Sequence, residues 1–269
     1  MKSRLLLLGA AVALFMSCSP DNDNDSSGTD TDYFPLASGD YWTYDVPGNA
    51  TTLSGRDSLY VGNDTVINAV TYKKMKTKAQ PFGFYSNSLN GNGIRKDGDK
   101  IRLTGAASVN FGTGLPINLD VADFVVFKES ATDGEQLSVL NGTLTQTIPG
   151  FEAYPMTITY SLKAMATGSL PTFTAPDGTV YTDVKTVKTT LNVKITTMIA
   201  PLVVPVPVLA PQDVVVSTQY YAKNIGMVYA NTAMHYELQD FSAFGLSLPI
   251  PQSGSQNQEE ILDTYHVGN

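Results

Sequence analysis

The chain has 269 residues, of which 42% are hydrophobic and 16% are charged, so it can bury the core of one large or two small domains. Its formal net charge of -8 argues against a nucleic-acid partner, because phosphate binding needs clustered Lys and Arg. One cysteine excludes an intrachain disulfide, and two histidines, His235 and His266, argue against a multi-histidine metal centre. We expect no cofactor and no metal ion.

Residues 1–17 have the layout of a secretory signal peptide. Lys2 and Arg4 give a positive start, Leu5–Phe15 is an apolar run, and a small residue precedes Cys18. The apolar run is too short to cross a hydrocarbon core of roughly 30 Å as a helix. We therefore expect residues 1–17 to be removed from the mature chain. Ordinary signal cleavage would leave Cys18 as an incidental thiol.

Residues 18–32 are polar and acidic, and they contain almost nothing that could be buried in a core. Such a composition is typical of a disordered tether. The aspartates from Asp21 to Asp32 also have a spacing compatible with a calcium-binding loop. Because Ser26 stands where that loop needs glycine for its sharp turn, we favour the tether over a calcium site.

The remaining segment, residues 33–269, is expected to form a single antiparallel β domain. Met156–Ala164 alternates apolar and polar side chains, and Val187–Ile199 does the same. The clearest hairpin is Gly93–Leu103, which we expect to turn at Asp97-Gly98, and Gly62-Asn63-Asp64 predicts a further tight hairpin. Ile117–Leu119 and Phe124–Phe127 are expected to be separate strands.

Two long one-sided strands in succession predict a broad sheet with one wet and one apolar face. No segment predicts a helix of any length. The predicted fold class is therefore all-β, as a curved antiparallel sheet or incomplete barrel, with a β-sandwich as the alternative.

The segment 200–211 is entirely apolar, yet its four prolines argue against both a helix and a sheet interior. One hypothesis is a hydrophobic connection packed across one end of the sheet. The other is an exposed apolar lip that contacts a ligand, a partner or a bilayer. The candidate residues of this lip are Leu202, Val203, Val204, Val206, Val208 and Leu209.

Catalytic patterns are largely missing from the sequence, and both histidines are interpreted as structural or solvated. A glycoside hydrolase would need two facing carboxyl groups with different pKa values. The acidic side chains that could supply such a pair are Asp120, Asp123, Glu129, Asp133 and Glu135. Acidic residues in turns are more often solvated loop groups, so we expect no enzymatic activity, with a glycoside hydrolase as the alternative.

Three short pieces carry a resemblance to a family. They are the Phe34-Pro35-Leu36 start followed by Gly39-x-x-Trp42-x-Tyr44, the segment Tyr181–Val184, and Tyr221-Ala222-x-x-x-Gly226-x-Val228. Together they resemble uncharacterised outer-membrane lipoprotein domains of the Bacteroidota. Some of these domains look like the bacterial lipoprotein-carrier fold, a curved antiparallel sheet that half-wraps an apolar cavity and normally lays helices across its opening.

The resemblance implies lipidation, such as palmitate, at Cys18, because Ser17-Cys18 is similar to the end of a lipobox. The acidic run after Cys18 resembles the signal that directs lipoproteins of this group to the outer face of the outer membrane, so the resemblance also implies a cell-surface location, with the periplasmic face of the outer membrane as the alternative. Asp57-Ser58-Leu59 and Asp64-Thr65-Val66 resemble the O-glycosylation sequon of exported proteins of this group, so Ser58 and Thr65 are candidate modification sites.

The sequence thus favours a lipid-anchored surface protein that binds a ligand without catalysis. The leading hypothesis is an apolar or amphipathic ligand held in the hollow of the curved sheet. The alternatives are a carbohydrate-binding module, with exposed tyrosines near Tyr41, Tyr85 or Tyr221 as its platform, and a purely structural surface protein.

Overall fold

The computed structural model describes residues 32–48, 54–110, 116–199, 204–242, 248 and 250–268. Asp32–Asn269 forms one compact unit. Cys18 and the expected signal peptide lie outside the described residues. Asp32 already belongs to the folded unit, because its backbone N–H donates to Asn224 Oδ1 at 3.0 Å and its carbonyl accepts from the Asn224 N–H at 2.6 Å.

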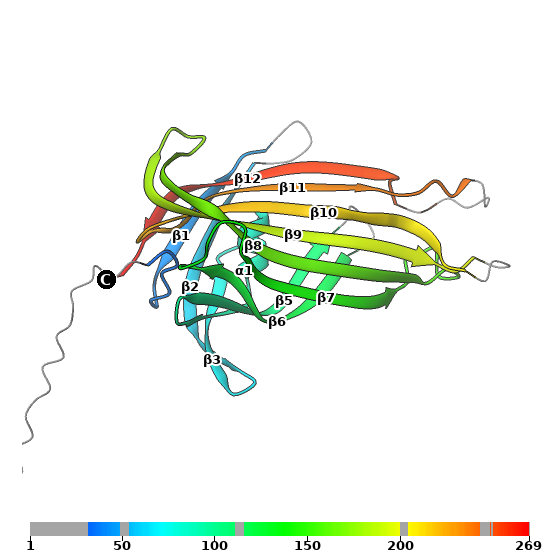
Figure 1. Ribbon diagram of the computed structural model, residues 1–269, viewed down its shortest axis with the longest axis horizontal. Helices are drawn as coiled ribbons and strands as arrows, with labels where there is room; N and C mark the ends of the chain where they lie inside the picture. The colour runs from blue at the N-terminus through cyan, green and yellow to red at the C-terminus, as the bar shows by residue number, and fades with distance from the viewer. Residues whose placement is uncertain are drawn as a thin grey trace, which may run out of the picture. The chain divides into compact units, whose positions relative to one another are not determined.

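The described part of this unit consists of β-strands and one short helix (Figure 1). In chain order the elements are β1 Tyr41–Val46, β2 Gly55–Ile67, β3 Val70–Thr77, α1 Phe84–Leu89, β4 Gly93–Asp97, β5 Lys100–Asn110, β6 Pro116–Lys128, β7 Gln136–Gln146, β8 Met156–Thr174, β9 Val180–Thr197, β10 Val206–Ala222, β11 Gly226–Glu237 and β12 Ser253–His266. The all-β prediction is confirmed.

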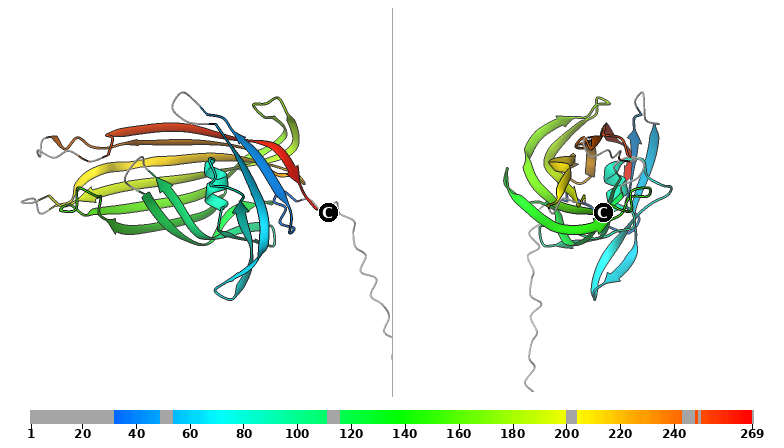
Figure 2. Two further views of the ribbon diagram at one scale, coloured as in Figure 1. Left: turned by 180° about the vertical axis from the view of Figure 1, so that it is seen from behind. Right: turned by 90° about the vertical axis from the view of Figure 1, so that its right-hand side faces the viewer.

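All twelve described strands belong to one antiparallel sheet, in the order β6-β5-β4-β3-β2-β1-β12-β11-β10-β9-β8-β7. The first and last strands pair with each other in its middle, and the borders are β6 and β7. No described ladder joins these borders, so the sheet curls into an incomplete barrel with one unsealed seam (Figure 2). The curved-sheet prediction is confirmed over the sandwich.

The long strands alternate as the sequence predicts. On the concave face, Ile158 of β8 lies opposite Ile195 of β9, and Leu162 lies opposite Leu191; all four are buried. Lys163, which follows Leu162 on β8, is exposed on the convex face. Each of these strands therefore packs one face against the core and exposes the other to solvent, as expected for strands of a curved sheet.

The hairpin predicted at Gly62-Asn63-Asp64 is wrong. Strand β2 continues through these residues, with a register shift between Val61 and Asp64 on its pairing with β3. The chain turns instead at Asn68 and Ala69, whose φ angles are +50° and +64°. Glycine and asparagine suit a bulge as well as a turn, so composition alone does not separate the two.

The hairpin of β4 and β5 is confirmed, with Asp97 opposite Lys100, although its loop is Gly98-Asp99 and not Asp97-Gly98. Ile117–Leu119 and Phe124–Phe127 are not separate strands, because both lie within β6. The register of β6 against β5 shifts in this region, and Asp123 has a φ of +49°. A bulge thus replaces the expected turn.

The proline-rich segment enters the sheet, contrary to the prediction. Strand β10 begins at Val206 and includes Pro207 and Pro211. Its register against β9 shifts between Pro207 and Leu209 and again between Leu209 and Gln212. Proline has no N–H to donate to a ladder, and bulges at both places accommodate it.

The six-residue helix α1 was not predicted. It lies on the concave side of the curled sheet (Figure 2). Its Tyr85 ring packs edge-on against Tyr44 of β1, with centroids 6.1 Å apart, and against Tyr221 of β10, at 6.4 Å. These contacts place α1 in the aromatic core near the joined chain ends.

Candidate functional site

The concave face is not uniformly apolar. Thr189 of β9 lies opposite Ser217 of β10, which lies opposite Thr232 of β11, which lies opposite Gln258 of β12. Residues directly opposite in antiparallel strands share a face. These four residues, called the polar stripe below, share the concave face with the buried Leu191.

The middle of the polar stripe is buried and internally satisfied. Ser217 is 0% and Thr232 is 1% exposed, and their hydroxyl oxygens lie 2.8 Å apart. The Gln219 side-chain amide donates to Ser217 Oγ at 3.0 Å. Because these hydrogen bonds replace the water lost on burial, this part of the stripe is a stable element of the core.

Glu260, two residues beyond Gln258 on β12, fixes the start of α1. Its Oε2 accepts from the Tyr85 N–H at 2.6 Å, and its Oε1 accepts from the Ser86 N–H at 2.9 Å and the Ser86 hydroxyl at 2.7 Å. The side chain is 1% exposed. A carboxylate that accepts free N–H groups at a helix start replaces a local cap, which Gly83 cannot provide.

Two further side chains complete the anchor of α1. Asp57 of β2 accepts from the Phe82 N–H at 2.8 Å and the Gly83 N–H at 2.7 Å. Gln258 accepts from the Phe84 N–H at 2.8 Å and donates to the Phe82 carbonyl at 2.6 Å. Strands distant in sequence therefore hold the helix on the concave face.

Burial dominates the ionisation of Glu260. Loss of water raises its pKa from 4.5 to about 7, and Asp57 adds to the rise, while the hydrogen bonds from Ser86 and Tyr85 oppose it. The anchor of α1 therefore contains a carboxyl group that binds a proton near neutral pH.

Along β12, Glu260 lies on one side of the polar stripe. On the other side of the stripe, side chains of the concave face are partly exposed to solvent. Met234 of β11 lies opposite Gln256 of β12, and both are half-buried. Thr189, at the β9 end of the stripe, is half-buried as well, and so is Tyr160 of β8, which shares the concave face and covers Gly142. We call Tyr160, Thr189, Met234 and Gln256, which surround the buried Leu191 and Val215, the open concave patch. Among the described residues, the side chains of Thr189 and Gln256 have no hydrogen-bond partner.

No family model, curated protein or solved structure matches this chain. In the described part of the chain, no helix is long and apolar enough to cross a membrane, and no group of three or more His, Cys, Asp or Glu could hold a metal ion.

The residues of the expected apolar lip differ in their exposure to solvent. Val208 and Leu209 are each 1% exposed and belong to the core. Val204 is 60% exposed and Val206 is half-buried. Leu202 and Val203 lie outside the described residues. In the described part of this set, Val204 and Val206 therefore retain surface for a contact.

The two candidate glycosylation residues lie within β2 and not in a loop. Ser58 and Thr65 are both half-buried. In the first sequon, Asp57 is buried and occupied by the anchor of α1. In the second, Asp64 pairs with Lys73 at 2.5 Å. Modification at these residues stays a prediction.

The predicted tyrosine platform is not assembled. Tyr85 and Tyr221 are 5% and 1% exposed, so neither ring can stack on a sugar from solvent. Tyr41 is 42% exposed, and its ring stacks on His266 with centroids 5.9 Å apart. The expectation that Tyr85 and Tyr221 are exposed is wrong, because both rings fill the core around α1.

Two of the carboxyl groups considered for a glycoside hydrolase are paired. Asp123 accepts from the Tyr72 hydroxyl at 2.8 Å and pairs with Arg95 at 3.1 Å. Glu135 pairs with Lys128 at 2.6 Å. These partners lower the pKa of both carboxyl groups, whereas a general acid needs a raised pKa.

The remaining acidic residues of this set have different surroundings. Asp120 and Asp133 are exposed, and Glu129 is half-buried.

Proposed function

We propose that this protein is a lipid-anchored, non-catalytic binding protein that holds a small amphipathic molecule on the open concave patch. The observation that carries the proposal is the partial exposure of concave-face side chains that surround the buried Leu191, namely Met234, Gln256, Thr189 and Tyr160. Partly exposed apolar and polar side chains that share a sheltered concave surface are typical of small-molecule sites.

The patch itself indicates the chemistry of the ligand. The thioether of Met234 and the ring of Tyr160 offer apolar contact, while the amide of Gln256 and the hydroxyl of Thr189 can donate and accept hydrogen bonds. The patch contains no Asp, Glu, Lys, Arg or His side chain. We infer an uncharged ligand with an apolar body and a hydroxyl, amide or ester group.

The core beside α1 is too closely packed to hold such a ligand. A cavity there of about 10 Å³ is lined by apolar residues that include Trp42, Met75 and Tyr85. This volume is close to the minimum for one water molecule. The open concave patch is therefore the better location on this face.

The lipid that attaches the chain to a membrane is the second part of the proposal. Cys18 is the acceptor of the lipid, and the acidic tether leads to the cell surface of an outer membrane. Supporting this part are the signal layout and the small residue before Cys18. Cells fed labelled palmitate should label the chain, and Cys18→Ala should abolish the label. Equal labelling of both chains would contradict lipidation at Cys18.

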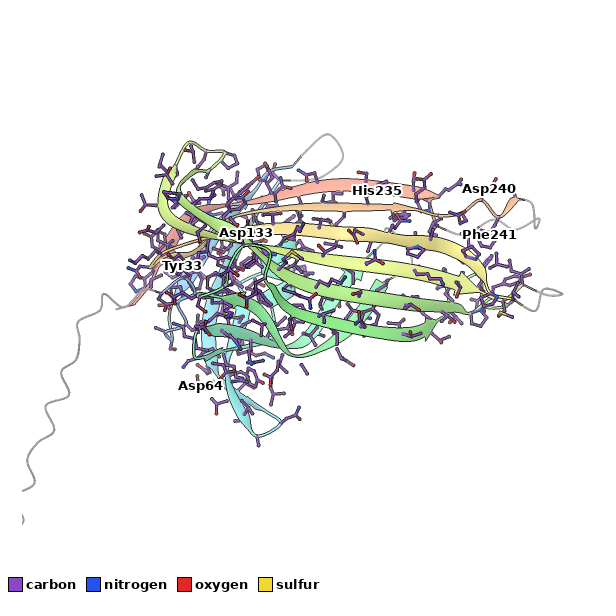
Figure 3. The ribbon with its side chains drawn as sticks, in the orientation of Figure 1. Tyr33, Asp64, Asp133, His235, Asp240 and Phe241 are labelled. Atoms are coloured by element: carbon purple, nitrogen blue, oxygen red, sulfur yellow. The ribbon has the colours of Figure 1, made fainter. Side chains whose placement is uncertain are left out.

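Binding is tested by titrating the full chain with the uncharged fluorescent probe N-phenyl-1-naphthylamine. Met234→Trp places a large ring on the patch and should weaken probe binding about tenfold or more. His235→Trp is the matched control, because His235 is the next residue on β11 and is exposed on the convex face (Figure 3). This variant should bind the probe like the parent chain.

Two results would contradict the binding proposal. The first is a parent chain that does not bind the probe. The second is an equal loss of affinity in Met234→Trp and His235→Trp, because the probe would then bind away from the concave face. Circular dichroism of both variants checks that the sheet is retained.

A further inference from the structure

Strand β7 is an exposed border without the usual protection of a sheet edge. Within the described residues it pairs with β8 alone. It forms the lower border of the long strands in Figure 1. None of its 11 residues is buried, and Gln136–Gln146 contains no charged residue and no proline. An unprotected row of backbone donors and acceptors can pair with another strand.

The opposite border, β6, also has a single partner strand, but it carries the protection that β7 lacks. It begins at Pro116 and carries Asp120 and Asp123. Its pairing with β5 contains two register shifts, and Asp123 has a φ of +49°. Proline, charge and bulges are the features that keep an edge strand from pairing. Pairing through β7 would therefore not continue through β6.

The sequence of β7 is nearly symmetric about Gly142. Leu140 and Leu144 stand two residues on either side of this glycine, and both are half-buried on the concave side. Asn141 and Thr143 flank it directly, and both are exposed on the convex side. Further out, two β-branched residues, Val139 and Thr145, stand at equal distances. The ladder with β8 has no register shift from Ser138 to Gln146.

We propose that β7 pairs antiparallel with β7 of a second copy of this chain, about a two-fold axis at Gly142. In this register each Leu140 lies opposite Leu144 of the second copy, so four half-exposed leucines cover one another. Asn141 lies opposite Thr143, and Val139 lies opposite Thr145. Both copies use the same strand, β7, for the contact, so the assembly is complete as a dimer.

Cysteine pairs in the full chain test the contact and its register. Asn141→Cys with Thr143→Cys places each new thiol opposite one of the second copy, at the roughly 5 Å separation that a disulfide needs. Mild oxidation should give a covalent dimer on a non-reducing gel. Thr159→Cys with Ser161→Cys is the matched control, because these residues lie opposite Thr143 and Asn141 on β8, one strand inside the border.

The control pair should give no more dimer than the parent chain with Cys18 alone. Absence of a dimer from the edge pair would overturn the proposal. So would equal amounts of dimer from the edge and control pairs, which would indicate random collision.

Charges at Val139 and Thr145 give a second test, made in the chain that carries the edge cysteines. Val139→Lys with Thr145→Lys places lysine opposite lysine at both ends of the contact and should reduce the cross-link at least fivefold. Val139→Lys with Thr145→Glu places lysine opposite glutamate and should restore it. Equal cross-linking of these two variants would overturn the proposed register.

Discussion

Glu260 shows how one side chain connects the sheet to the helix it holds. Its carboxyl group is buried on the concave face, where neighbouring strands place mainly apolar side chains, and it accepts three hydrogen bonds from α1. Gln256, Gln258 and Glu260 alternate on β12 in phase with Leu262. This alternation was a usable signal for a polar inner face, but it was missed because polar residues at period two normally indicate a solvated face.

The pKa of Glu260 predicts a dependence of stability on pH. The folded-state pKa, about 7, exceeds the ordinary value of 4.5, so the folded state holds the proton more tightly than the unfolded chain. The contribution of this group is complete below pH 4.5 and is lost as pH rises through about 7. At 1.36 kcal/mol per pKa unit, the loss is roughly 3 kcal/mol.

Urea unfolding of the parent chain and of Glu260→Gln from pH 4 to pH 8 measures this loss. The variant cannot titrate at this position, so the difference in unfolding free energy between the two chains isolates Glu260 from all other carboxyl groups. The advantage of the parent chain should shrink as pH rises. A constant advantage would show that folding leaves the pKa of Glu260 unchanged, and a growing advantage would show that folding lowers it; either result would contradict the prediction.

At the scale of elements, the long strands were predictable and their connections were less so. The alternation of Met156–Ala164 predicted which side chains face the core, because burial on one face fixes the register of a strand. The turn after β2 was not predictable from composition, since Asn68-Ala69 lacks the glycine that usually follows asparagine in such loops. The strand Val214–Lys223 was predictable from the sequence, but the first part of β10 was missed because bulges, which leave no clear sequence pattern, accommodate its prolines.

The turn at Asn68-Ala69 yields a stability prediction. Ala69 has a φ of +64°, a conformation that costs residues with a Cβ atom about 1–2 kcal/mol and costs glycine much less. Ala69→Gly should therefore stabilise the protein by about 0.5–1 kcal/mol, after the greater flexibility of glycine in the unfolded chain is subtracted. Ala69→Val should destabilise it. Thermal unfolding of the three chains gives the order, and destabilisation by Ala69→Gly would contradict the account.

At the scale of the whole molecule, the curved sheet was predictable, and the open concave patch was not. Long amphipathic strands indicated one apolar face, but which inner residues stay accessible depends on what covers them. That cover includes α1, which is only six residues long and has no local capping side chain. Its position depends on Asp57 and Glu260, which are about two hundred residues apart in the chain. No local pattern predicts such a contact.

Photo-cross-linking locates the proposed ligand on the concave face between β8 and β12. An uncharged fatty alcohol that carries a diazirine would be irradiated with the full chain, and the modified peptides mapped by mass spectrometry. We expect adducts on Met234, Gln256 and Tyr160, which excess unlabelled alcohol should suppress. Adducts confined to convex-face residues such as His235 and Lys163, or adducts that excess alcohol does not suppress, would contradict this location.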